Sequence, residues 1–276
     1  MGTLRARLTR EGRFAAAFLK RELLGAGPWS YGLESLGGLV GLFLLHFLAR
    51  CFRGTVGSFS QGMDYFTFSL IGLVLAQSML RGFSTFSERV KFLLLSGTLE
   101  TFWTTRRSLP VLLLYDSLWN LVFSSFNAAL LLIFGAGMLG AHLAAPQIAA
   151  VWGISLLTSL AMGSLGLLSA ATLIALGHRV ARLWAPVGPA VTLTSGSFFT
   201  ASVFPHWVHG VIGWFPLTHA LKLARGVVLP LEPGVSAQAW GALVGLGVLQ
   251  GALGWAALRW AVRRARSDGR WAAVGF

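Results

Sequence analysis

Runs of about 20 apolar residues recur along the whole chain, and they constrain its fold more than any other feature of the sequence. A helix of 20 residues is about 30 Å long, which matches the hydrocarbon thickness of a bilayer. Only 11% of the residues carry charge, against roughly 25% in an average soluble domain. One globular core could not bury so many runs. The sequence therefore predicts an all-α integral membrane protein.

Six runs are long enough to cross the membrane, and glycine, proline and polar residues separate them. We expect residues 1–276 to form a single transmembrane domain with six transmembrane helices. The approximate spans are 33–52, 66–82, 109–139, 148–176, 183–204 and 237–262.

Three segments outside these runs have a distinct composition. Residues 4–24 mix apolar residues with arginine and lysine, which indicates an N-terminal amphipathic elbow helix at the membrane surface. Residues 83–108 are polar enough to leave the bilayer and include an amphipathic helix over 88–103. Residues 205–233 alternate apolar and aromatic residues with glycine and proline. This alternation predicts short re-entrant helices that dip into the outer leaflet, because non-helical backbone at membrane depth needs protein or water around it.

The formal net charge of +13 at first suggests nucleic acid, but the positions of the basic residues argue against it. They lie at the ends of the apolar runs, where the positive-inside rule expects them on the cytoplasmic side. With both termini in the cytoplasm, the opposite side receives only Arg50, Arg53, Lys222 and Arg225 of the 22 basic residues. We expect a multi-pass membrane protein with both termini cytoplasmic, lipid around it and no nucleic-acid partner.

Motifs that carry catalysis are absent from the sequence. It contains no GxxxxGK[ST], HExxH or GxSxG stretch. The single cysteine, Cys51, gives neither an intrachain disulfide nor a metal-binding spacing. His206 and His209 are three residues apart but lie among tryptophans, as interfacial histidines do. We therefore expect no catalytic residue and no metal site in this chain.

Polar residues inside the apolar runs are the best candidates for function, because a charge near the bilayer centre costs several kcal/mol. Asp116, Asn120, Ser124 and Asn127 follow helical spacing and share one face. This stripe could line a substrate path, or it could hydrogen-bond a neighbouring helix. Gln77 invites the same two interpretations. The candidate translocation path is Gln77, Asp116, Asn120 and Asn127.

Small residues also recur at the intervals that allow helices to approach closely. Gly37 and Gly41 form one such pair, Gly241 and Gly245 form another, and Gly247, Gly251 and Gly254 form a series in the last run. From these we expect only that the helices pack tightly.

Three short motifs give the sequence a family resemblance. They are Ser-Gly-Thr-Leu-Glu at 96–100, Ser-Gly-Ser-Phe-Phe at 195–199, and Phe-Pro-Leu-Thr-His-Ala-Leu at 215–221, which leads to Arg225. With these motifs, the chain resembles the membrane-spanning permease subunits of type-2 ABC exporters over nearly its whole length. That class includes drug, polysaccharide and lipid exporters of the bacterial inner membrane.

The resemblance implies that a cytoplasmic coupling helix follows the second span and docks on a separate ABC ATPase. This coupling segment is 84–105. It differs from the family at one point, because many relatives have a Thr-Pro pair where this chain has Thr104 and Thr105 followed by two arginines. The turn after the coupling helix is therefore expected to differ. The coupling residues would be Gly97, Thr98, Leu99, Glu100, Arg106 and Arg107.

The resemblance also implies an assembly. Two copies of the permease, as a homodimer or as a heterodimer with a related permease, would form a twelve-helix pore above two ATPase subunits. ATP and Mg would bind the ATPase, and this chain would hold no cofactor. The extracytoplasmic gate would include Phe198, Phe199, Pro205, Trp207 and Pro216.

The cargo class follows only from composition. An apolar, aromatic-rich chain with few charges in the membrane favours an amphipathic or lipidic cargo, and sugars linked to lipid carriers are compatible with it. A secondary transporter is one alternative, but the two halves show no convincing inverted repeat. An intramembrane lipid-modifying enzyme is another, and it would need facing carboxylates or a His–Asp pair. A non-transporting assembly protein is the third.

Overall fold

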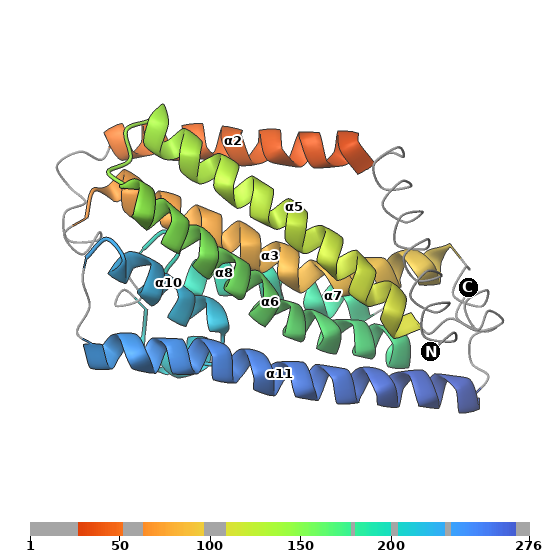
Figure 1. Cartoon of the computed structure of the whole chain (residues 1–276). Coiled ribbons are helices and arrows are strands. Elements are labelled where there is room, and N and C mark those ends of the chain that lie inside the picture. Colours follow the sequence, from red (N-terminus) through yellow and green to blue (C-terminus); the bar gives the residue numbers. More distant parts are fainter. Residues whose placement is uncertain are drawn as a thin grey trace, which may run out of the picture. The chain divides into compact units, whose positions relative to one another are not determined.

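The computed structural model describes residues 27–51, 63–96, 109–177, 180–199, 204–229 and 233–268. Within these ranges every regular element is a helix, which confirms the all-α fold class for the described part of the chain (Figure 1). The helices are α2 (Gly27–Cys51), α3 (Tyr65–Leu95), α5 (Leu109–Gly137), α6 (Ala145–Leu176), α7 (Ala181–Trp184), α8 (Val187–Thr194), α9 (His206–Ile212), α10 (Pro216–Gly226) and α11 (Pro233–Asp268). The chain divides into two units, Met1–Gly41 and Leu42–Phe276, and the packing below concerns the second.

Five of the described helices are long and apolar enough to cross a membrane. They coincide with the first, second, third, fourth and sixth of the expected spans. Their bounds are Tyr31–Cys51, Tyr65–Leu95, Leu112–Gly137, Ala145–Leu176 and Ser236–Ala265. The chain is thus a multi-pass membrane protein by the length and hydropathy of its helices.

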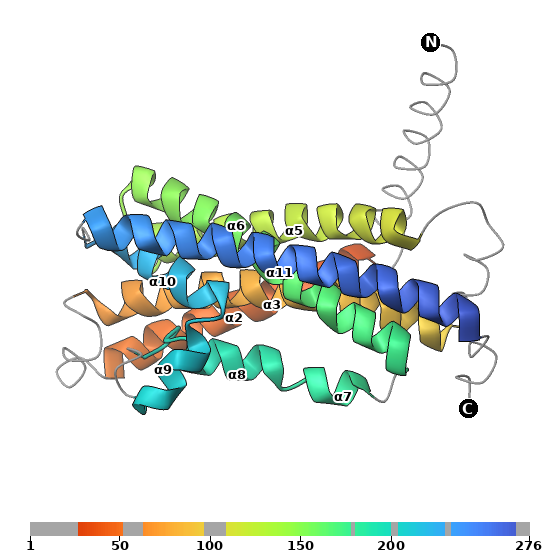
Figure 2. The same ribbon diagram turned by 90° about the horizontal axis from the view of Figure 1, so that it is seen from below.

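The expected fifth span, 183–204, does not form one continuous helix. Its described residues form α7 and α8, of four and eight residues, which follow one another in Figure 2. A turn at Ala185 and Pro186 separates them, and Pro186 has no backbone N–H to continue the hydrogen-bond ladder of α7. After α8 the chain turns again at Gly196, whose φ of 88° is a left-handed conformation that glycine adopts without strain.

The second span is longer than expected. We predicted a membrane helix over 66–82 and a separate amphipathic helix, whereas α3 is one helix of 31 residues that ends at Leu95. Asp64 caps its start by accepting a hydrogen bond from the Thr67 N–H at 3.3 Å. A lone glycine such as Gly82 costs only about 1 kcal/mol within a helix and does not end it.

The core of the second unit lies around α6, which packs against α3 on one side and α11 on another (Figures 1 and 2). Glycines allow both contacts to be close. A Cβ at Gly82 would overlap the Ser159 carbonyl oxygen of α6, and a Cβ at Gly254 would lie 2.7 Å from the Ser164 carbonyl oxygen. Gly247 and Gly251 also face α6, at Ala161 and Ser164, which confirms tight packing for this glycine series. The pairs Gly37–Gly41 and Gly241–Gly245 make no such contact among the described residues.

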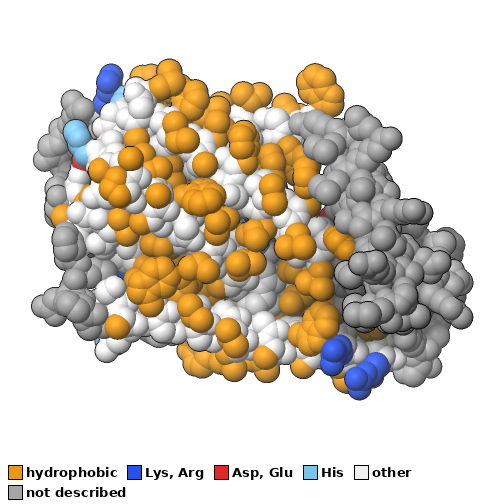
Figure 3. Space-filling model, viewed as in Figure 1, with side chains coloured by type: hydrophobic (Ala, Val, Ile, Leu, Met, Phe, Trp, Pro, Cys, Tyr) orange, Lys and Arg blue, Asp and Glu red, His pale blue; other side chains and the backbone are white. Residues whose placement is uncertain are grey.

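Apolar side chains cover the face of the molecule shown in Figure 3, and lysines and arginines gather at its ends. Large residues on the outer sides of α5 and α11 are half or more exposed, among them Leu118, Phe126, Val248 and Trp260. So many exposed large apolar side chains suit contact with lipid or with another membrane helix and do not suit water.

The glycine contact between α3 and α6 gives a first prediction. Gly82→Ala should lower the free energy of unfolding by about 1–3 kcal/mol, because the added methyl group must push the Ser159 backbone away. Gly241→Ala is the matched control, since no atom lies within 4 Å of a Cβ there. Thermal denaturation of the detergent-solubilised protein measures both. Equal stability of the two variants would contradict a close α3–α6 contact.

Candidate functional site

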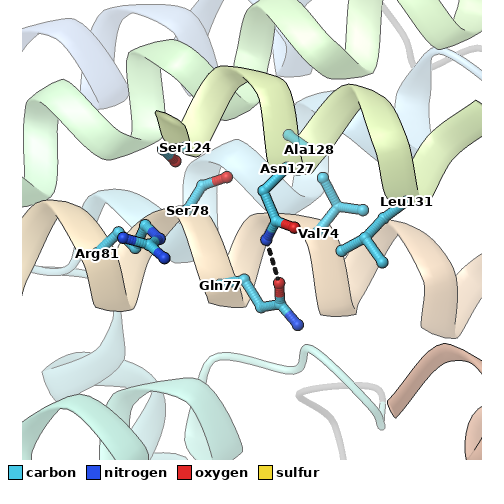
Figure 4. A pocket seen from close by; sticks show the side chains of 8 residues that line it. All are labelled: Val74, Gln77, Ser78, Arg81, Ser124, Asn127, Ala128 and Leu131. Atoms are coloured by element: carbon cyan, nitrogen blue, oxygen red, sulfur yellow. Dashed lines mark hydrogen bonds between the residues drawn. The ribbon is translucent and has the colours of Figure 1, made fainter. Parts of the chain in front are cut away.

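Polar side chains of α3 and α5 meet in the middle of these helices and form a shallow crevice (Figure 4). Gln77, Ser78 and Arg81 lie within little more than one turn of α3, and they face Ser124 and Asn127 of α5. In this conformation the crevice is too narrow to hold a water molecule. The remaining lining residues are Val74, Ala128 and Leu131.

A hydrogen bond joins the two helices at this crevice. The Asn127 amide Nδ2 donates to Gln77 Oε1 at 2.9 Å (Figure 4). The Asn127 side chain is 3% exposed, and its Oδ1 is buried with no hydrogen-bond partner among the described residues. At this position the polar stripe therefore bonds a neighbouring helix, which was one of the two interpretations. It also retains an acceptor that a bound molecule could use.

Arg81 adds a positive charge to the same crevice. Its guanidinium carbon lies 4.3 Å from the centroid of the Phe123 ring of α5, within the range of a cation–π contact. The sequence analysis did not select Arg81 or Ser78 as path residues. The sequence does indicate that Arg81 lies with Gln77, because it follows Gln77 by four residues and so shares its face of the helix.

The other two stripe residues are placed differently. The Asp116 side chain is buried, at 8% exposed. The Asn120 amide donates to the Asp116 carbonyl oxygen of its own helix at 3.1 Å. The structure thus brings Gln77 and Asn127 together, whereas Asn120 hydrogen-bonds within α5.

A second constellation surrounds the break between α9 and α10. Three consecutive carbonyl groups there, those of Ile212, Gly213 and Trp214, lie at hydrogen-bond distance from side chains. Their partners are Thr218 Oγ1 at 2.8 Å, His219 Nε2 at 3.0 Å and Gln250 Nε2 of α11 at 2.8 Å. Backbone that leaves the helical pattern at membrane depth needs such partners.

Arg225, in the last turn of α10, hydrogen-bonds backbone carbonyl groups at another break, the turn that follows α8. Its side chain is only 9% exposed, and its Nη2 donates to the carbonyl oxygens of Gly196 and Ser197 at 2.8 and 3.0 Å. Its Cζ lies 3.5 Å from the centroid of the Phe68 ring of α3. Burial lowers the pKa of Arg225 to about 9, which still leaves the guanidinium protonated at pH 7. The sequence analysis noted Arg225 as the end of a motif and as one of the few basic residues on the extracytoplasmic side, but it assigned the residue no contact.

The residues expected to form an extracytoplasmic gate do not share one environment. Phe199 and Trp207 are 47% and 74% exposed, and Pro205 is also exposed. Phe198 is half-buried, and Pro216 is buried at the first position of α10. Their role stays a prediction.

Two expected features lie outside the described residues. One is the elbow helix at 4–24, and the other is the set of coupling residues Gly97, Thr98, Leu99, Glu100, Arg106 and Arg107. The described chain ends its second span at Leu95 and Ser96, directly before Gly97.

A family model described as ABC-2 type transporter matches residues 31–229, a range that runs from α2 through α10. The chain belongs to the ABC-2 type transporter family. No curated protein sequence matches it. Family membership confirms the resemblance inferred from the three motifs, and it makes the chain the permease subunit of a type-2 ABC transporter.

The crevice of this ABC-2 permease gives a second prediction. In a double-mutant cycle, Gln77→Leu and Asn127→Leu should show a coupling free energy of about 0.6 kcal/mol, the average for hydrogen bonds between membrane helices. Asn120→Leu is the control, because Asn120 bonds its own helix, and it should show no coupling to Gln77→Leu. Reversible unfolding in mixed micelles measures the cycle. Additive effects of the Gln77 and Asn127 substitutions would argue against the hydrogen bond.

Proposed function

We propose that this permease exports its cargo by alternating access, driven by ATP hydrolysis on a separate ABC ATPase. The observation that carries the proposal is the continuity of α3. This helix runs from Tyr65 to Leu95 without a break and stops two residues before Gly97. Its 31 residues span about 46 Å at 1.5 Å each. A displacement applied at its cytoplasmic end would therefore reach the far side of the membrane.

The ATPase would dock on the segment that follows α3. Gly97 to Glu100 would enter the ATPase groove, and Arg106 and Arg107 would flank the contact at the membrane surface. ATP and Mg would stay on the partner. The permease would contribute different affinities for cargo in its two states, since a ligand shifts an equilibrium only by its differential affinity.

Two copies of the permease would enclose the path, either as a homodimer or with a related chain. In the proposed orientation both termini face the cytoplasm of a bacterial-type inner membrane. The arrangement of the helices supports this: the end of α3, the start of α5, the end of α6 and the end of α11 lie at the same end of the bundle (Figure 1). The basic residues of these segments, such as Arg89 and Arg263, are thereby gathered on one side.

The cargo would be amphipathic, with a lipidic part and a polar head that can include a glycan. The crevice between α3 and α5 offers amide and hydroxyl groups, the buried Asn127 Oδ1 acceptor and the Arg81 cation. The surroundings are apolar, with Val74, Ala128 and Leu131 in the same wall. Such a combination suits a molecule that carries both a polar group and a hydrocarbon chain.

The ATPase contact can be tested by affinity purification of the tagged permease from its native membranes. A P-loop ATPase should co-purify with the wild-type chain, and Glu100→Arg should reduce its recovery and the Mg-ATP hydrolysis of the preparation by about tenfold or more. Lys222→Glu serves as the matched charge reversal on the opposite side of the membrane, where it should change neither.

Two results would contradict the proposal. One is a stable, transport-active permease from which any ATPase is absent. The other is uptake or efflux that an ion gradient drives in proteoliposomes without ATP, which would indicate a secondary transporter.

A further inference from the structure

Arg225 joins three parts of the permease that are distant in sequence. Its guanidinium bonds the carbonyl oxygens of Gly196 and Ser197, in the turn after α8, and stacks on Phe68 near the start of α3. The side chain itself belongs to α10. One buried cation therefore ties the turn at 195–197 and α3 to the helix that follows the α9–α10 break.

The contact between the turn and α3 is as close as backbone atoms allow. A Cβ at Gly72 would overlap the Ser197 carbonyl oxygen, so only glycine lets the turn lie against α3 at this point. Ser197 is fully buried there. Gly72 follows Phe68 by one helical turn, so the same face of α3 holds both the turn and the guanidinium.

The far side of α10 is attached as well. Gln250 of α11 donates to the Trp214 carbonyl oxygen just before α10, at 2.8 Å. Gln147 of α6 donates to the Val227 carbonyl oxygen just after α10, at 3.3 Å. Amide hydrogen bonds thus attach the residues just before and just after α10 to α11 and α6, and Arg225 attaches α10 to α3.

We propose that Arg225 is a positioning residue that transmits the displacement of α3 to the extracytoplasmic segment formed by α9 and α10. The inference rests on the proposed function, because it takes the cytoplasmic end of α3 as the site that the ATPase moves. Phe68 and Gly72 lie near the other end of this helix. A shift of α3 along or across its axis therefore pulls on the turn at 195–197 and, through the guanidinium, on α10.

Arginine is suited to this role by its shape. The planar guanidinium can stack on the Phe68 ring and donate in its own plane to two carbonyl groups at once. Lysine keeps the charge but has neither the plane nor the fixed donor directions. Arg225→Lys is therefore expected to weaken the connection between α3 and α10, although it keeps the positive charge.

The test follows the cytoplasmic end of α3 and the α9 helix in the permease purified with its ATPase. In a Cys51→Ser background, one reporter is Lys91→Cys on the cytoplasmic end of α3, and the other is Val211→Cys on α9; the side chains at both positions are exposed. The rate of labelling by a hydrophilic maleimide is measured with and without Mg-ATP and vanadate. The second measurement is ATP hydrolysis by the same complex, which needs no knowledge of the cargo.

In the otherwise unchanged complex, nucleotide should alter the labelling rate at both reporters. Arg225→Gln and Gly72→Ala should keep the response at Lys91→Cys and reduce that at Val211→Cys by about fivefold or more, the scale of a coupling free energy between distant sites. Hydrolysis should persist. Lys222→Ala, an exposed position on the same helix as Arg225, should behave as the unchanged complex does.

A full response at Val211→Cys in both Arg225→Gln and Arg225→Lys would overturn the inference. If Arg225→Gln does not give a monodisperse complex, the milder substitutions Arg225→Lys and Phe68→Leu are compared with the unchanged complex in its place. Failure of the proposed function looks different, because nucleotide would then change labelling at neither reporter in the unchanged complex.

Discussion

In a membrane every backbone N–H and C=O group must find its partner within the protein, and the rest of this structure depends on that constraint. The long helices meet it internally. The described helices are separated by several turns, and at two of these, 195–197 and 212–214, five carbonyl groups lie at hydrogen-bond distance from the side chains of Arg225, Thr218, His219 and Gln250. At these two turns polar side chains therefore bond the backbone, whereas the buried Asn127 bonds the side chain of Gln77.

The second unit can tolerate these breaks because its centre is firmly packed. Without a hydrophobic driving force between helices in lipid, association depends on close contact and on hydrogen bonds. Gly82 and Gly254 let α3 and α11 approach the backbone of α6, while Asn127 bonds Gln77 between α5 and α3. The long helices α3, α5 and α11 pack around α6, while α8 packs on α3, and α10 packs on α11, α6 and α3.

Hydropathy and motifs predicted the membrane class, the family and five of the long helices, because each depends on composition over some 20 residues or on a local pattern. They did not predict the break of the expected fifth span into α7 and α8. The run at 183–204 contains no charged residue, and what interrupts it is backbone geometry at Pro186 and Gly196. The role of Arg225 was missed for a related reason. Its partners are backbone carbonyl groups nearly 30 residues away, and a sequence does not show which carbonyl groups lie near a given side chain.

Three regions to which the proposals assign a function follow one another along α3. Phe68 and Gly72 hold the turn and Arg225 near its start, Gln77, Ser78 and Arg81 line the crevice in its middle, and Leu95 ends it directly before the proposed coupling residues. From Phe68 to Leu95 the helix covers about 40 Å. Because α3 packs closely against α6 at Gly82, it cannot bend freely at that contact. A displacement of one end of α3 would therefore reach the other end as a tilt or a slide. In the proposed motion, a displacement of α3 that reaches Arg225 would also shift Gln77 relative to Asn127, because the crevice lies between the two ends of the helix. Opening of the crevice and displacement of the extracytoplasmic segment are then two results of one motion.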